Sequence, residues 1–277
     1  MVMAVDRLRL TLPSARARQP RQASLALWGW ALPLALLAAW ELTTRFGLVA
    51  PHLLPAPALV WREVADLWRD GTLFEHLGIT LWRVLTGFAL GTLAATVLGA
   101  LTGYSTAAHR LLDPTIQAIK AVPSLAWVPL FILWLGIFEA SKVTLIAVGA
   151  FFPVYLNLST AIGQVDRKLV EVGRMYGFSP LTLVRRVLLP ATLPAYVTGL
   201  RGGLALAWMF VVAAELMGAS QGLGFLMLDG QMTGRPALII ASLILFALMG
   251  KASDLALART TAPWLRWQDD FARMRKT

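Results

Sequence analysis

The residue types that usually carry out catalysis are present in this chain, but none of them stands at catalytic spacing. The three histidines, His52, His76 and His109, are far apart, and none has a carboxylate at metal-ligand spacing. Gly250-Lys251 lacks the upstream glycine and the following Ser or Thr of a phosphate-binding loop. We therefore expect no enzyme activity, no ATP hydrolysis, and no bound cofactor or metal in this chain.

One stretch, from Glu171 to Pro190, gathers charge, glycine and proline between two hydrophobic segments. Just before and within it, apolar residues recur at three- and four-residue steps, which predicts a short amphipathic helix: Val165, Leu169, Val172 and Tyr176. Gly177 tolerates a positive φ and is expected to end that helix. Ser179 and Pro180 suit the cap and the first position of a second short helix. The pattern indicates a compact docking element, with an ordinary amphipathic loop at the bilayer surface as the alternative.

The elements that must position this stretch are strongly apolar. Hydrophobic residues make up 57% of the 277 residues and charged residues 14%, and the mean hydropathy is +0.66. Soluble domains carry about 25% charged residues, so we expect an all-α integral membrane protein. The net charge of +10 lies beside the apolar runs, which favours anionic lipid headgroups over nucleic acid as its partner.

Six membrane spans of about 20 residues are expected within a permease domain at 25–258. They are predicted at 25–43, 79–104, 121–138 and 143–163, then from beyond Pro190 and Pro194 to near Glu215, and at 237–257. Pro123 and Pro129 interrupt the third span. The more polar residues 107–120 before it predict a short inner turn and the start of a helix. Basic tails are expected at 1–24 and 259–277.

An outer amphipathic segment is expected at 51–70, with a helix over 58–68 that begins at Pro57. Its apolar residues are Val60, Trp61, Val64, Leu67 and Trp68. We expect this helix to lie in the outer membrane interface or against the rim of the helix bundle.

Small residues recur every four positions along the second span. A ridge of this kind lets another helix approach closely, so we assign it to helix packing: Gly87, Gly91, Ala95, Gly99 and Gly103.

Arginine and lysine placement predicts the orientation. The two tails and the loop at 164–190 are basic, whereas the loops on the other side carry few cations. We expect both termini and this loop on the cytoplasmic side of a bacterial inner membrane.

Few ionisable residues approach the membrane interior, and snorkelling towards span ends accounts for Arg83, Arg201, Glu215 and Lys251. Lys251 and Asp254 are three residues apart and able to pair. Candidates for a translocation path are the polar groups within or at the ends of spans three to five: Ser124, Trp127, Asn157, Trp208 and Glu215. The alternative is that the tryptophans pack and that Asn157 bonds a backbone carbonyl.

The docking stretch resembles the Glu-Ala-Ala loop of ABC importer permeases. In that family the loop runs Glu-Ala-Ala, three residues, Gly, nine residues, an aliphatic residue, one residue and Leu-Pro. This chain keeps those spacings from Glu171 through Gly177 and Val187 to Leu189-Pro190, with Val172 and Gly173 in place of the two alanines.

Further stretches resemble the nitrate, taurine and aliphatic-sulfonate branch of these permeases over about residues 40–268: Leu54 to Pro57, Val122 to Leu125, Leu133 to Gly136, Val165 to Arg167, Ala214-Glu215 and Trp264 to Trp267. The resemblance implies a type I importer: a homodimer of six-span subunits, two cytoplasmic ATPase subunits that bind ATP and Mg, and a periplasmic or lipid-anchored binding protein. It implies ATPase docking through Leu169, Glu171, Val172, Gly173, Tyr176, Gly177, Ser179, Pro180 and Pro190.

The implied function is ATP-driven import of a small anion such as an aliphatic sulfonate, taurine or nitrate. The alternatives are an ATP-independent secondary transporter or channel, which would need an ion relay across the spans, and a membrane scaffold.

Overall fold

The computed structural model describes residues 22–265 and 267, and every regular element in them is helical. The tail expected at 1–24 lies almost wholly outside the described residues, as does the end of the tail at 259–277. The chain is therefore all-α over the part described, as the sequence predicts.

The helices follow one another in this order: α1 (Gln22–Arg45), α2 (Pro57–Arg69), α3 (Thr72–Tyr104), α4 (Thr106–Ala121), a 3-10 turn (Ser124–Trp127), α5 (Val128–Leu135), α6 (Glu139–Gly163), α7 (Arg167–Met175), α8 (Pro180–Leu183), a π-helical turn (Val184–Leu188), α9 (Leu189–Leu216), α10 (Leu223–Met232), α11 (Pro236–Thr261) and a 3-10 turn (Ala262–Leu265).

Four helical stretches of the described residues are long and apolar enough to cross a membrane: Thr72–Tyr104, Glu139–Gly163, Leu181–Leu216 and Pro236–Leu265. A fifth is added if α4 and the helical stretch after it form one broken span. The first predicted span, at 25–43, falls within the 24-residue helix α1. The count of six spans stays a prediction.

The third span differs from the expectation at 121–138. Residues 107–120, where the sequence predicts a short turn and a helix start, lie wholly within the 16-residue helix α4. The chain then bends by 85° between α4 and the stretch Leu125–Leu135. The bend has a local cause, because a residue before proline avoids the helical conformation, and Val122 before Pro123 has φ −74° and ψ 125°. None of the residues of α4 is buried, and the half-buried Asp113 joins this helix to α6, because Tyr155 Oη donates to Asp113 Oδ1 at 2.8 Å.

Helix α6 lies between α3 and α9, and glycines bring these neighbours close. A Cβ on Gly91 of α3 would lie 2.2 Å from the carbonyl oxygen of Ala147. A Cβ on Gly203 of α9 would lie 2.9 Å from the carbonyl oxygen of Ala150. The backbones therefore meet without intervening side chains in both contacts. The small-residue ridge predicts the contact of α3 with α6 but not that of α9 with α6.

The outer segment is fastened to α1 and α11. Val60 of α2 is buried in a cluster that includes Ala237 and Ala241 of α11, and Trp40 of α1 packs against the same cluster. Trp61 and Trp68 instead remain exposed. The five apolar residues of α2 thus do not form one buried face. The helix packs on the rim of the bundle, which is the second of the two expected placements, and its position in the membrane interface stays a prediction.

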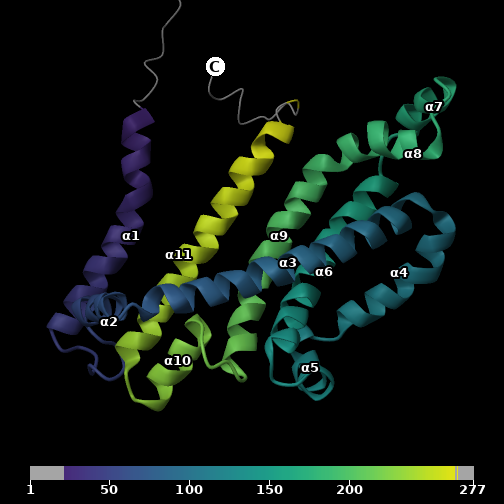
Figure 1. Ribbon diagram of the computed structural model, residues 1–277. Helices are drawn as coiled ribbons and strands as arrows, with labels where there is room; N and C mark the ends of the chain where they lie inside the picture. Colours follow the sequence, from purple (N-terminus) through teal and green to yellow (C-terminus); the bar gives the residue numbers. More distant parts are fainter. Residues whose placement is uncertain (1–21, 266, 268–277) are drawn as a thin grey trace, which may run out of the picture.

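Figure 1 shows how the elements divide between the two ends of the molecule. Helices α2, α5 and α10 lie at one end, and α7 and α8 lie at the other. Helix α1 begins and α11 finishes at the end where α7 and α8 lie. The docking segment, defined here as residues 164–190, is therefore on the same side as these helix ends.

Candidate functional site

The first helix of the docking segment has a defined beginning and a defined end. Asp166 caps α7 by accepting a hydrogen bond from the Lys168 backbone N–H at 2.9 Å. At the other end Gly177 has φ +71°, as predicted. The backbone N–H of Phe178 donates to the Gly173 carbonyl at 3.1 Å, and that of Gly177 donates to the Arg174 carbonyl at 2.9 Å. These two bonds close the helix with a Schellman motif, which fixes the direction of the following chain.

The second helix begins where the sequence predicts but does not end there. Ser179 Oγ accepts from the Thr182 backbone N–H at 3.3 Å, as expected of a cap. The helix then continues without a separate end, because Leu181–Leu216 forms one 36-residue helix through Pro190 and Pro194. The expectation of a short second helix and a span beginning after these prolines is therefore wrong.

A π-helical turn explains how this helix passes Pro190. Proline has no backbone N–H, and its ring clashes with the carbonyl four residues earlier in a regular α-helix. Here the turn is widened, and the Leu189 N–H donates to the carbonyl of Val184, five residues back. The widened turn carries the helix across the proline.

The inner side of the docking segment packs tightly on the bundle. Leu183 and Leu188 are buried in one cluster with Leu158 and Ile162 of α6. Gly173 is buried as well, and a Cβ there would lie 2.7 Å from Leu183 Cδ1. The segment is therefore a well-packed extension of α6 and α9.

The outer side of the docking segment is apolar and exposed. The side chains that form it are Leu169, Val172, Met175, Tyr176 and Leu181, and 77% of Tyr176 and 87% of Met175 is accessible. The exposed residues Glu171, Gly177, Ser179 and Pro190 belong to the same segment, whereas Gly173 faces inward. Sequence reasoning missed Met175, although it stands three residues after Val172 and so on the same helix side.

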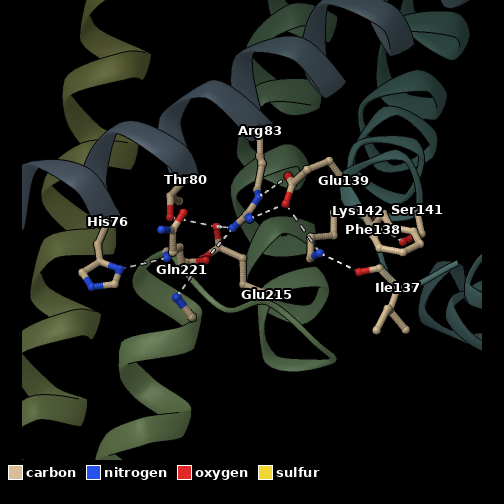
Figure 2. Close-up of polar contacts among 12 residues, drawn as sticks. His76, Thr80, Arg83, Ile137, Phe138, Glu139, Ser141, Lys142, Glu215 and Gln221 are labelled. Carbon is tan, nitrogen blue, oxygen red and sulfur yellow. Dashed lines mark hydrogen bonds and ion pairs between the residues drawn. The ribbon is translucent and has the colours of Figure 1, made fainter. Parts of the chain in front are cut away.

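A second polar arrangement lies at the opposite side of the bundle (Figure 2). Arg83 of α3 is only 2% exposed and forms two hydrogen bonds to Glu139 of α6, from Nε at 2.7 Å and from Nη2 at 2.6 Å. Its Nη1 donates to Glu215 Oε1 of α9 at 2.8 Å. Lys142 Nζ lies 3.6 Å from Glu139 Oε1. Two cations and two carboxylates thus join three helices, and their formal charges balance.

The same arrangement holds the segment between α9 and α10. Arg83 Nη1 donates to the Gln221 carbonyl at 2.7 Å, and the Gly224 N–H donates to Glu215 Oε2 at 2.7 Å. The Gly222 N–H donates to His76 Nδ1 at 3.0 Å. A Cβ on Gly222 would lie 2.5 Å from Glu215 Oε1, so glycine is needed for the loop to cover this carboxylate.

Snorkelling is therefore the wrong account of Arg83 and Glu215. Both side chains are buried among polar partners, and Glu215 is 0% exposed. Because Glu215 has no accessible surface, it does not line an open path in this structure. The sequence offers no spacing from which this contact could be found, since the two residues are 132 positions apart.

The other path candidates each meet a different partner. Asn157 Nδ2 donates to the Pro153 carbonyl of its own helix at 2.8 Å. Trp208 Nε1 donates to Ser253 Oγ of α11 at 2.8 Å. Trp127 stacks on Phe131, and its buried Nε1 has no partner among the described residues. Ser124 lies in the 3-10 turn before α5. The structure thus does not gather these residues into one site.

One further ion pair replaces the predicted pairing of Lys251 with Asp254. Arg201 Nε donates to Asp254 Oδ1 at 2.8 Å, and Arg201 Nη2 donates to Asp254 Oδ2 at 2.9 Å. Arginine offers two parallel donors that match a carboxylate, a geometry that lysine cannot provide.

Several apolar spans, together with a packed segment that displays apolar side chains beyond them, define a multi-pass membrane protein. Residues 73–259 match the family described as binding-protein-dependent transport system inner membrane component. The chain belongs to this family, and so it is a permease subunit of a transport system in the inner membrane.

Similar proteins include relatives and a solved structure. SsuC of Bacillus subtilis (strain 168), named for aliphatic sulfonates transport, is 38% identical over 88% of this chain and 90% of its own. TauC of Escherichia coli (strain K12), named for taurine transport, is 31% identical over 88% of this chain and 90% of its own. The inward-facing MetNI methionine ABC transporter matches with a TM-score of 0.62 and 21% identity, over 70% of this chain and 97% of that one. Because the identity is only 21%, the match to this structure shows a similar fold and nothing further.

Proposed function

We propose that this chain is the permease subunit of an ATP-driven importer of a small anion, with a sulfonate or taurine as its substrate class. Relatives that span most of the chain are named for aliphatic sulfonates and for taurine, which supports this class. Relatives named as ABC permeases favour an ATP-driven system over an ATP-independent transporter or channel.

The observation that carries the proposal is the exposed apolar side of the docking segment. Met175, Tyr176 and Leu181 would be costly to leave in water, because each exposes a large apolar area. The Schellman motif and the buried Leu183 hold these side chains in place before any partner binds. A preformed apolar surface of this kind suits a cleft on a soluble ATPase subunit, because little ordering entropy is lost on docking.

The remaining partners follow from the same proposal. Two ATPase subunits bind ATP and Mg and receive the docking segments of two copies of this chain. A periplasmic or lipid-anchored binding protein delivers the substrate to the opposite end, and lipid surrounds the spans. Both termini are cytoplasmic, which agrees with α1 beginning and α11 finishing at the same end of the molecule as the docking segment.

The test places a charge in the docking surface without touching the packed side. In Met175→Glu a side chain that is 87% exposed becomes charged, so folding is preserved while docking into an apolar cleft is opposed. The matched control is Met232→Glu, because Met232 is 80% exposed on α10 at the other end of the molecule. We expect the ATPase subunit to copurify with the control and not with Met175→Glu. Normal copurification and normal ATP-dependent uptake in Met175→Glu would remove the docking assignment.

A further inference from the structure

An open cavity of about 420 Å³ lies between helix α4 and the last turns of α3 and α6. Its wall includes Thr102 on α3, Asp113 on α4 and Ser159 on α6. It also reaches Gln164, the first residue of the docking segment, so it lies where α6 passes into that segment. Pockets that hold small molecules measure about 300–1,000 Å³, so this cavity is large enough for a small solute.

The wall of this cavity is polar and carries one formal charge. Among the described residues that line it, Asp113 is the only aspartate, glutamate, lysine or arginine. Hydroxyl groups of α3 and α6 lie beside it, and the exposed side chains of His109, Gln117 and Gln164 form part of the rim. A free anion would therefore meet a carboxylate here and no lysine or arginine to neutralise it.

The hydroxyl groups beside the carboxylate have already used their protons. Tyr155 Oη donates to Asp113 Oδ1 at 2.8 Å, and Thr102 Oγ1 donates to the Leu98 carbonyl at 2.9 Å. Because a hydroxyl has one proton, the 3.0 Å hydrogen bond between Thr102 and Ser159 must be donated by Ser159 Oγ. All three hydroxyls are buried. The lone pairs of Ser159 Oγ therefore remain as acceptors, and no described residue donates to Asp113 Oδ2.

Acceptors beside a single carboxylate favour a ligand that donates several hydrogen bonds and carries a positive charge. A primary ammonium group has three N–H donors and one positive charge. Its hydrogen bonds to a carboxylate are charge-assisted and so stronger than those of a neutral donor. The side-chain amides of Gln117 and Gln164 can donate to an anionic group of the same molecule. The cavity thus suits a small zwitterion better than a simple anion.

We propose that this cavity binds the ammonium group of a small zwitterion, and that taurine, 2-aminoethanesulfonate, is the member of the proposed substrate class that it accepts. Asp113 and Ser159 accept the ammonium protons, and Gln117 and Gln164 donate to the sulfonate. An alkanesulfonate without an amino group lacks the donors and is not retained. The inference rests on the proposed function, because it separates two kinds of substrate named there. In the proposed orientation, the ligand enters this cavity from the cytoplasmic side.

The first test asks whether taurine occupies the cavity of the full-length chain in detergent. The chain has no cysteine, so Thr160→Cys places a single thiol on an exposed part of the wall. We expect labelling by a water-soluble methanethiosulfonate reagent to slow by about threefold or more as taurine is raised well above its Kd. Ethanesulfonate should leave the rate unchanged.

The matched control for this labelling is Thr115→Cys. Thr115 is also exposed, and it lies about 200° around α4 from Asp113, away from the cavity. Taurine should not slow the labelling of this control. If taurine does not slow the labelling of Thr160→Cys, or if ethanesulfonate slows it equally, the proposal is overturned.

The second test changes the carboxylate. In Asp113→Asn the side-chain oxygen can still accept from Tyr155 Oη, so the contact of α4 with α6 is kept while the charge is lost. We expect the taurine concentration that protects Thr160→Cys to rise by about tenfold or more, as for the loss of a charged hydrogen bond. The Tm should stay close to that of the parent. The matched control is Asp70→Asn, at the exposed end of α2, which should bind taurine as the parent does. Unchanged protection in Asp113→Asn would show that the carboxylate only joins two helices.

The two proposals can fail separately. If taurine protects the cavity through Asp113 while the complex with the ATPase subunit takes up no ethanesulfonate, taurine or nitrate, the proposed import function is wrong and the binding site stands. If that complex takes up taurine or ethanesulfonate while taurine gives no protection of Thr160→Cys, the import function stands and the binding site is overturned.

Discussion

Replacing Gly91 with alanine should destabilise the protein, because α3 and α6 touch at this point through their backbones. The added Cβ would lie 2.2 Å from the Ala147 carbonyl oxygen. Backbone atoms cannot rotate away as side chains do, so α3 must move by about 1 Å to restore van der Waals contact. Overpacking of this kind costs about 2 kcal/mol. For a chain of this size the loss corresponds to about 4–8 °C in Tm.

Two other glycine-to-alanine variants on α3 serve as controls for the stability of Gly91→Ala. A Cβ on Gly78 would meet no atom within 4 Å, so Gly78→Ala should be neutral or slightly stabilising, since alanine favours helix by up to about 1 kcal/mol over glycine. A Cβ on Gly99 would lie 3.2 Å from the Tyr155 carbonyl oxygen, so Gly99→Ala should be intermediate.

The measurement is the fraction of detergent-purified protein that remains monodisperse after heating, followed by size-exclusion fluorescence across a temperature series. We expect Gly78→Ala to have the highest Tm, Gly99→Ala an intermediate Tm and Gly91→Ala the lowest. Equal Tm values for Gly78→Ala and Gly91→Ala would refute the close approach of α3 to α6, since both changes add the same methyl group to the same helix.

Two further predictions concern buried polar groups. Arg83→Met should destabilise by about 3–5 kcal/mol because Glu215 then stays buried without its cation, and the added change Glu215→Gln should restore much of the loss; thermal unfolding of the single and double variants checks this, and equal damage in both would contradict it. Trp40→Phe should lower stability by about 1 kcal/mol because it removes the Nε1 hydrogen bond to the Pro55 carbonyl, which measures 3.0 Å. Its ATPase copurification should be normal, and a loss of docking would show that α1 has another role.

Helix ends and close helix approaches could be predicted because their causes are local. Gly177 has the positive φ that its position suggests, and Ser179 caps the next helix through a residue three positions on. The ridge on α3 is also local, since its four-residue spacing places Gly87, Gly91 and Gly99 on one side of the helix. For such features the sequence neighbours contain all the information needed.

Pairings between distant helices could not be predicted in the same way. Arg201 and Asp254 are 53 positions apart, and nothing in the spacing of either favours this pairing over Lys251 with Asp254. The full length of α4 was missed for the same reason, because the partner of Asp113 is Tyr155, 42 positions further on.

The π-helical turn at Val184–Leu188 supports a last prediction about how the docking segment is aimed. A π-helical turn contains one residue more than the α-helix would need, and each residue turns a helix by about 100°. Leu183 before the turn and Leu188 at its end are both buried. A regular helix of the same residues would therefore turn the docking segment by about 100° relative to α9.

If the extra residue of the turn is removed together with Pro190, which requires it, the helical segments before and after the turn should keep their places. Deletion of Arg186, which is exposed, combined with Pro190→Ala, lets a regular helix form without changing the buried register on either side. We expect this variant to fold and to copurify with the ATPase subunit. Deletion of Thr198, also exposed but in the regular part of α9, rotates one half of the helix by about 100° against the other and should prevent assembly. If the two deletions are equally harmful, the extra residue of the turn is not the element that sets the direction of the docking segment.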